Sequence, residues 1–253
     1  MTGIVYLVGA GPGAPDLLTV RAARLLGEAN IVFHDALVHP ETLALAPQAE
    51  KVLVGKRCGK LSTAQLFINK RLVHAARIHR VVVRLKGGDP MLFGRAHEEL
   101  SHLVENRIQV EIVPGVTAAL AGSAEIGVSL TQRGVARSVT FVTPRIGEGE
   151  RASGWVAAVL ASDTAAIYMG AGEAAAISSA LIAAGKSALT PVALVANASL
   201  PSAHRRFGTL QELAGLAEGV PGGPALIFIG EVYGESATDV TVDYLLRRKA
   251  SNQ

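Results

Sequence analysis

The sequence predicts two α/β domains with mostly parallel sheets, and three observations lead to this fold class. Short apolar runs that stop at Gly, Pro or Asp alternate with amphipathic stretches, which is typical of strands alternating with helices. Hydrophobic residues make up 49% of the chain and aromatic residues only 4%, which suits sheets covered by Ala-rich helices. The length of 253 residues suits two domains of about 100–150 residues each.

The first predicted domain covers residues 1–133. Its apolar runs stop at turn-forming residues and predict strands at 4–8, 31–34, 51–54, 81–85 and 110–113. Stretches with apolar residues three and four positions apart predict helices at 16–28, 64–77, 95–106 and 116–126.

The second predicted domain covers residues 134–253. Residues 131–137 have turn character and a new apolar run follows, which places the predicted boundary after Arg133. Strands are expected at 138–143, 165–169, 192–195 and 225–229. Helices are expected at 154–160, 173–184 and 210–216.

Composition limits the class of partner. The net charge of +3 is too small to indicate a nucleic-acid binder, and no apolar run reaches the roughly 18 residues of a membrane-spanning helix. Residues 1–133 hold 15 Lys and Arg against 11 Asp and Glu, whereas residues 134–253 hold 9 against 10. An anionic partner is therefore expected at the first domain, although ordinary surface charge would give the same numbers. The single Cys58 and the absence of a signal-peptide pattern favour a cytoplasmic protein.

A Gly-rich turn between a strand and a helix, within residues 5–19, is the first candidate ligand site. Residues 9–14 fit the dinucleotide fingerprint, with Asp35 ending the next strand. Pro12 removes a backbone donor from the turn, and Pro15 delays the helix, so the turn suits a ligand other than a pyrophosphate. The alternative is a tight turn without a ligand.

A second candidate site lies in the sequence RLKGGDPMLFGR, residues 84–95. Gly87 and Gly88 let the backbone approach a ligand closely, and Asp89 can accept hydrogen bonds from hydroxyl or ammonium groups. The alternative is a turn held by the Asp-Pro pair.

Two further segments have small or apolar residues where a strand ends. The small residues of 113–134 would let a bulky ligand lie close, or serve close helix–sheet packing. Within residues 165–172 a strand is expected to end at Met169-Gly170, and Met169 by itself is more typical of a core than of a ligand contact. The seven histidines form no metal-binding pattern, and neither a nucleophile elbow nor a P-loop is present. No metal is expected.

Together these segments resemble the tetrapyrrole methylase family. The matching strings occur in family order and cover residues 4–233. They are VYLVGAGPGAPDLLT, DALV, VGKRCG, VVRLKGGDPMLFGR, VPGVTAALAGSAEIGVSLTQRG, SVTFVT, IYMG and GGPALIFIGEVY.

The resemblance implies a homodimer of two-domain chains, with S-adenosylmethionine (SAM) bound in the cleft between the domains and released as S-adenosylhomocysteine. It further implies methylation of uroporphyrinogen III at C2 and then C7, through precorrin-1 to precorrin-2, a precursor of sirohaem, cobalamin or haem d1. Alternatives of the same fold are other precorrin C-methyltransferases, diphthine synthase and an rRNA ribose methylase. A nicotinamide-dependent oxidoreductase and a non-catalytic binding protein are alternatives of other classes.

The resemblance also implies roles for individual residues. Asp35 matches the proposed base and Lys56 the proposed proton donor, while Arg95, Glu98 and Arg133 match positions that face the tetrapyrrole. The alternatives are a strand-end cap for Asp35 and a solvated cation for Lys56. Arg95 and Glu98 could instead form a surface i,i+3 pair, and Arg133 could brace the turn between the domains. The residues that match SAM contacts are Pro12, Gly87, Gly88, Asp89, Leu92, Thr117, Ala118, Met169, Ala198 and Ala225.

Several positions depart from the usual family pattern. His34 and Glu125 each stand where the family often has Tyr. Ala96 and His97 replace a Gly-Gly pair, and Gln132 replaces a common His. Asn197 follows Ala196 where the family often has Glu-Asn. These differences concern the substrate pocket rather than the SAM site.

Overall fold

The computed structural model describes residues 2–54, 61–147, 153–220, 222–234 and 244. Contacts divide the chain into two units, Met1–Ala118 and Ala119–Gln253, each with its own five-stranded sheet and helices. The predicted α/β class is confirmed in both units.

The first unit is built on a wholly parallel sheet of strand order β3-β2-β4-β1-β5. Its strands are β1 (Ile4–Gly9), β2 (Ile31–His34), β3 (Glu50–Leu53), β4 (Val81–Lys86) and β5 (Gln109–Val113). Its helices are α1 (Val20–Glu28), α2 (Pro40–Ala44), α3 (Leu61–Ile78) and α4 (Ala96–Glu105). The expected strands of this unit are all present.

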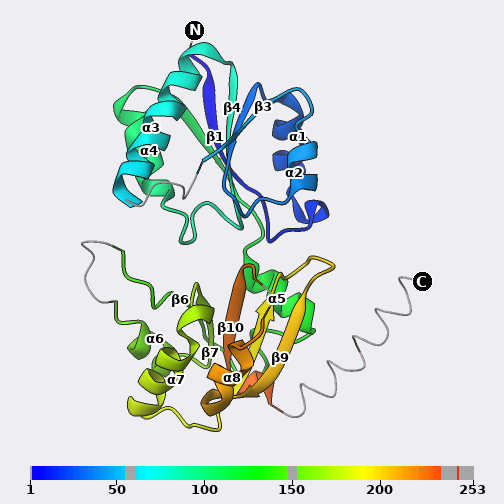
Figure 1. The fold of residues 1–253 in the computed structure, drawn as a ribbon, viewed down its shortest axis with the longest axis vertical. Helices are drawn as coiled ribbons and strands as arrows, with labels where there is room; N and C mark the ends of the chain where they lie inside the picture. Colours follow the sequence, from blue (N-terminus) through cyan, green and yellow to red (C-terminus); the bar gives the residue numbers. More distant parts are fainter. Residues whose placement is uncertain (1, 55–60, 148–152, 221, 235–243, 245–253) are drawn as a thin grey trace. The chain divides into compact units, whose positions relative to one another are not determined.

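Helices cover both faces of the first sheet, with α3 and α4 on one face and α1 and α2 on the other (Figure 1). Side chains of β1 alternate between the two cores, so that Leu7 packs toward α3 and Val8 toward α1. The strand β1 is followed by α1 on one face, and the adjacent strand β4 is followed by α4 on the other face. Such a switch in strand order is where parallel α/β sheets bind ligands, outside the carboxyl ends of the strands.

The second unit has a mixed sheet of strand order β6-β7-β10-β8-β9, with one parallel and three antiparallel pairings. Its strands are β6 (Val139–Val142), β7 (Thr164–Tyr168), β8 (Pro191–Ala196), β9 (His204–Thr209) and β10 (Ala225–Gly230). The prediction of mostly parallel sheets holds for the first sheet and is wrong for the second. The reason is that β10 inserts in the opposite direction between β7 and β8, and β9 folds back on β8 as a hairpin.

The helices of the second unit are α5 (Ala118–Ile126), α6 (Trp155–Ala161), α7 (Ala174–Ala183) and α8 (Leu213–Ala217). The helices α6, α7 and α8 share a core on one face of the sheet. On the other face, α5 packs so closely that a Cβ on Gly122 would lie 2.7 Å from the ring of Phe228. Because α5 packs on the second sheet, the division falls at the first residue of α5 rather than after Arg133, the boundary expected from the sequence.

Within the described part of the chain, no helix is both long enough and apolar enough to cross a bilayer.

Candidate active site

Three loops meet in backbone contact at the carboxyl ends of β1, β4 and β5. The amide of Gly11 donates to the carbonyl of Gly88 (3.2 Å), and the amide of Gly88 donates back to Gly11 (2.7 Å). A Cβ on Gly9 would lie 2.6 Å from the Cα of Gly115, and a Cβ on Gly115 would collide with the carbonyl oxygen of Gly88. Only glycine allows the three loops to approach so closely.

Asp89 fastens this arrangement through its carboxylate. Its Oδ2 accepts a hydrogen bond from the amide of Gly115 (2.8 Å) and its Oδ1 accepts one from the amide of Met91 (2.8 Å). Beside it, Gly87 is exposed, and among the described residues a Cβ there would meet Leu37 alone, at 3.6 Å. The end of β4 thus presents open backbone next to a fixed carboxylate.

The structure brings most of the predicted SAM contacts to this one edge. Six of them lie in the loops after β1, β4 and β5, namely Pro12, Gly87, Gly88, Asp89, Leu92 and Thr117, and Ala118 begins α5 directly after the last of these loops. Open glycine backbone beside small and apolar residues fits a ligand that combines an apolar ring with hydroxyl, amino and carboxylate groups, as SAM does.

The other three predicted SAM contacts share one edge of the second sheet. Met169 follows β7, is 46% exposed and has a left-handed backbone (φ 56°). Ala198 follows β8, and Ala225 begins β10 beside it, paired with Ala196. Left-handed non-glycine residues cost conformational energy and occur often at ligand sites.

A buried carboxylate supports the loop around Ala198. Glu125 on α5 is 4% exposed and forms an ion pair with Arg205 of β9. The amide of Ser199 donates to Glu125 Oε2 (3.3 Å), and Arg205 Nε donates to the Glu125 carbonyl (3.0 Å). Ser199 is itself left-handed (φ 73°), so Glu125 stabilises an unfavourable loop conformation next to a predicted cofactor contact.

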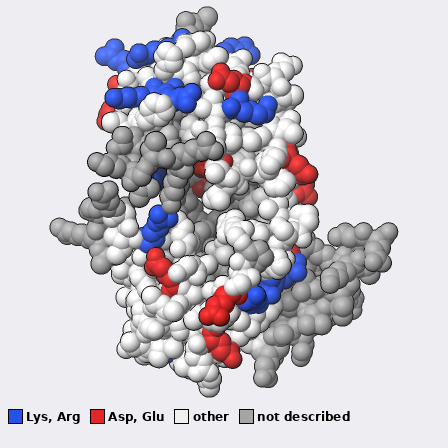
Figure 2. Space-filling view, viewed as in Figure 1, with Lys and Arg blue, Asp and Glu red and all other residues white. Residues whose placement is uncertain are grey.

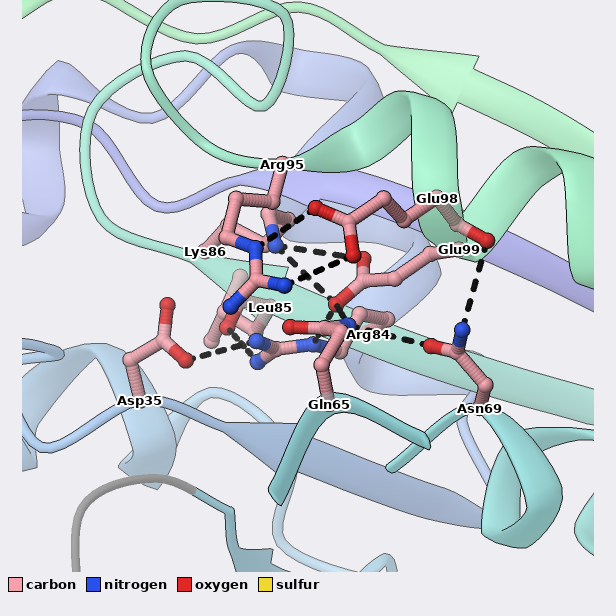
Figure 3. Close-up of polar contacts among 9 residues, drawn as sticks. All are labelled: Asp35, Gln65, Asn69, Arg84, Leu85, Lys86, Arg95, Glu98 and Glu99. Atoms are coloured by element: carbon pink, nitrogen blue, oxygen red, sulfur yellow. Dashed lines mark hydrogen bonds and ion pairs between the residues drawn. The ribbon is translucent and has the colours of Figure 1, made fainter. Parts of the chain in front are cut away.

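The first unit also contains a buried network of charges, drawn in Figure 3. Glu99 on α4 is fully buried and accepts hydrogen bonds from three side chains. Arg84 Nε lies 3.0 Å from its Oε1, and Lys86 Nζ lies 3.1 Å from each of its oxygens. Gln65 donates to the same Oε1 (3.2 Å). Two cations of β4 therefore share one carboxylate inside the core.

Asp35 connects this network to the surface. Arg84 Nη2 donates to Asp35 Oδ1 at 2.6 Å, while Arg84 Nη1 donates to the carbonyl of Leu85 (3.2 Å). The side chain of Asp35 is 31% exposed, whereas those of Arg84, Lys86 and Glu99 are at most 5% exposed. The carboxylate of Asp35 is thus the part of the network that a ligand can reach.

Burial and pairing shift the pKa values of the two cations in opposite directions. Burial disfavours the charged form of Arg84, but the charges of Glu99 and Asp35 raise its pKa above the ordinary value. For Lys86, burial and then the charge of Arg84 lower the pKa in spite of Glu99. The positive charge of Arg84 is therefore held more firmly than that of Lys86.

The structure pairs Arg95 with Glu98, both predicted to face the tetrapyrrole. Arg95 Nε and Nη2 donate to the two Glu98 oxygens at 2.6 and 2.7 Å, and both side chains are exposed (Figure 3). These hydrogen bonds lower the pKa of Glu98. Arg133 is exposed in the turn closed by Gln132 and Ala136 in the second unit.

The predicted proton donor, Lys56, lies outside the described residues. Among the described residues, no group of three or more His, Cys, Asp or Glu is arranged to hold a metal ion.

We expect Arg95→Ala to change the free energy of unfolding by less than about 1 kcal/mol, because exposed ion pairs contribute little. Arg95 lowers the pKa of Glu98, so the pair stabilises the fold at pH values above the ordinary pKa of a carboxyl group. This stabilisation is lost as the pH falls through the lowered pKa of Glu98 and the carboxylate takes up a proton. Urea unfolding at pH 7 measures the effect. Arg24→Ala, which breaks the exposed pair with Glu28, is the matched control. A loss above about 2 kcal/mol would contradict this assignment of Arg95 to the surface.

Comparisons with known proteins identify the family. The model of the Tetrapyrrole (Corrin/Porphyrin) Methylases matches residues 4–214, so the chain belongs to this family. A uroporphyrinogen-III C-methyltransferase of Pseudomonas aeruginosa is 44% identical over 233 residues, which cover 92% of this chain and 95% of that protein. A crystal structure of the uroporphyrin-III C-methyl transferase of Thermus thermophilus, complexed with S-adenyl homocysteine, is 42% identical with a TM-score of 0.79. The match covers 91% of this chain and 98% of that one.

Other relatives are longer. A siroheme synthase of Sodalis glossinidius is 46% identical over 231 residues, which are 91% of this chain but 49% of that protein. The chain thus spans about half the length of the curated siroheme synthases that it matches. The predicted α/β class and the predicted family, whose members are SAM-dependent C-methyltransferases, are confirmed. The roles of individual residues remain predictions.

Proposed function

We propose that this chain transfers methyl groups from SAM to C2 and then C7 of uroporphyrinogen III, giving precorrin-1 and then precorrin-2. The names of the Pseudomonas and Thermus relatives support this substrate. The observation that carries the proposal is the carboxyl edge of the first sheet. There, open glycine backbone at Gly87 and the reachable carboxylate of Asp35 end neighbouring strands. We also propose that the protein is a cytoplasmic homodimer.

In this proposal SAM is held by backbone and small side chains. The loops after β1, β4 and β5 carry most of the proposed contacts in the first unit, and Met169, Ala198 and Ala225 are those proposed in the second. SAM supplies an electrophilic methyl group on a sulfonium. The task of the protein is to hold the nucleophilic pyrrole carbon in line with that methyl group, since positioning carries much of the acceleration.

Asp35 is placed to act as the base. Once the ring carbon has gained a methyl group, the macrocycle must lose a proton to become neutral again. The Asp35 carboxylate is partly exposed and held by Arg84 at 2.6 Å, so it is reachable and fixed in direction. A positioned carboxylate of this kind is a suitable general base.

The substrate carries eight carboxylates, so cations are needed around it. Arg95 is exposed at the end of the loop that follows β4, and its planar group suits bidentate pairing with a carboxylate, as it pairs with Glu98 in this structure. On the face drawn in Figure 2, Lys and Arg side chains of the first unit lie interspersed with acidic ones. On this face the described cations do not form one continuous basic patch, and we assign substrate recognition to individual arginines such as Arg95.

The direct test is an anaerobic reaction of the purified protein with uroporphyrinogen III and SAM. We expect S-adenosylhomocysteine to be released, and the oxidised product to gain the mass of two methyl groups. SAM binding without methylation of uroporphyrinogen III would overturn the proposed substrate. The next substrates to test would be later precorrins, because a cobalt precorrin-4 methyltransferase is 26% identical with a TM-score of 0.81. Absence of SAM binding would overturn the proposal as a whole.

A further inference from the structure

The burial of Arg84, Lys86 and Glu99 has a cost that hydrophobic side chains would avoid. All three are at most 5% exposed, and two of them carry the same charge. Removing charges from water is unfavourable, and apolar residues of similar volume often give an equally or more stable core. Stability alone therefore does not account for this network in the core between β4, α3 and α4.

The network is arranged as a chain of contacts that ends at Asp35. Glu99 holds the Nε side of the Arg84 guanidinium at 3.0 Å, and the Leu85 carbonyl holds Nη1 at 3.2 Å. The remaining nitrogen, Nη2, then points at Asp35 Oδ1, 2.6 Å away (Figure 3). Because the guanidinium is planar and rigid, fixing two of its nitrogens also fixes the direction of the third.

Glu99 is itself fixed from two other directions. Lys86 donates to both of its oxygens at 3.1 Å. Gln65 of α3 donates to Oε1 at 3.2 Å and also to Asn69 at 3.0 Å, and Asn69 donates to the backbone carbonyl of Glu98 at 3.3 Å. The Glu99 carboxylate is therefore held between β4, α3 and α4, and it cannot turn without breaking several charge-assisted hydrogen bonds.

We propose that Glu99 and Arg84 are positioning residues, which fix the carboxylate of Asp35 in the direction that the methyltransferase reaction requires. The inference rests on the proposed function, in which Asp35 is the base. Glu99, fully buried, acts through Arg84 and touches no substrate. Asp35 is the part of the network that reaches the solvent, 31% exposed at the end of β2.

A double-mutant cycle tests this inference. Glu99→Gln keeps the size of the side chain but removes its charge. Arg84 and Lys86 then lose the carboxylate that they share, while Arg84 keeps its ion pair with Asp35. We expect kcat to fall about tenfold to a hundredfold, as a small misplacement of a reacting group does, with the KM for SAM within about twofold of wild type. In an Asp35→Asn background, the same substitution should lower kcat by no further than about twofold. Full multiplication of the two effects would overturn the proposal.

Arg84→Lys provides a second variant, because it keeps a buried cation that pairs with carboxylates but loses the planar fork. Its kcat should also fall about tenfold to a hundredfold. In the Asp35→Asn background, Arg84→Lys should likewise lower kcat by no further than about twofold. Glu28→Gln, on the exposed surface of α1, is the control that should leave kcat unchanged.

Crystal structures of Glu99→Gln and Arg84→Lys give a readout that does not depend on turnover. We expect the Asp35 carboxylate to leave its wild-type position while the β2 backbone stays in place. An unmoved Asp35 in both variants would overturn the inference, whatever the substrate. Wild-type protein that fails to methylate uroporphyrinogen III would overturn the proposed function instead. The crystal structures would then still decide whether Glu99 and Arg84 position Asp35.

Discussion

Replacing Gly115 by alanine should weaken SAM binding by at least about tenfold and lower the free energy of unfolding by about 1–3 kcal/mol. The added Cβ would collide with the Gly88 carbonyl oxygen and lie 2.8 Å from the Gly9 Cα. Both neighbours are backbone atoms of adjoining loops, so they cannot turn aside as a flexible side chain would. The loops after β1, β4 and β5 would have to separate, and they hold six of the proposed SAM contacts. Calorimetric titration with SAM and urea unfolding measure the two effects.

Gly27→Ala is the matched control for this substitution. Gly27 is exposed on α1, and a Cβ there would meet no atom of the described residues within 4 Å. Alanine should therefore stabilise the helix by about 0.5–1 kcal/mol and leave SAM binding unchanged. Unchanged SAM affinity in Gly115→Ala would contradict the assignment of the glycine loops to the cofactor.

Replacing Asp35 by asparagine should lower kcat by about a hundredfold or more, because a positioned general base contributes at least that much. Asparagine keeps the size of the side chain but cannot take up a proton. SAM affinity should stay within about twofold, since Asp35 lies after β2 while the proposed first-unit SAM contacts follow β1, β4 and β5. Single-turnover kinetics with saturating SAM measures the chemical step.

Glu105→Gln, an exposed carboxylate near the end of α4, is the control for Asp35→Asn and should keep wild-type kcat. A kcat within about threefold of wild type in Asp35→Asn would exclude Asp35 as the base.

The first sheet could be predicted from the sequence because its central strands are buried on both faces. Continuous apolar runs such as Val81–Val83 leave little choice of secondary structure, and they end at turn-forming residues. The same logic misses β9, since HRRFGT is half-buried and carries two arginines and a glycine. It also misses α2, a five-residue helix. Pairing with β8, rather than apolar periodicity, determines β9.

The direction of strands in the second sheet was not predictable from local patterns. A helix lies between β7 and β8, as in a parallel unit, and both strands do run in the same direction. What separates them is β10, which comes from the end of the chain and inserts between them. No local feature of the sequence before residue 225 indicates that insertion.

The buried charges were the main feature of the site that sequence analysis missed. A signal was present, because Val82, Arg84 and Lys86 alternate along a strand whose every residue is buried. Cations at alternate positions of a buried strand require a carboxylate partner on the facing helix. Identifying Glu99 as that partner, rather than its neighbour Glu98, needs the register of α4 against the sheet. The pairing of Glu125 with Arg205 likewise joins elements far apart in the chain.

The resemblance to the tetrapyrrole methylases, by contrast, indicated residues that lie together at one edge of each sheet. Asp89 and Thr117, distant in sequence, lie in loops that follow two strands of one sheet. The structure adds that the carboxylate of Asp89 joins these loops through the amide of Gly115. A substitution at Asp89 would therefore disturb the loops as well as any direct contact with the cofactor.

The most direct test of the proposed reaction is the position of the methyl groups in the product. The protein would be incubated anaerobically with uroporphyrinogen III and SAM labelled with carbon-13 in its methyl group, and the product examined by NMR. We expect two labelled methyl groups, at C2 and C7 of the macrocycle. Label at any other ring position, or none in the tetrapyrrole while SAM is bound, would contradict the assignment of this chain to the C2 and C7 methylation of uroporphyrinogen III.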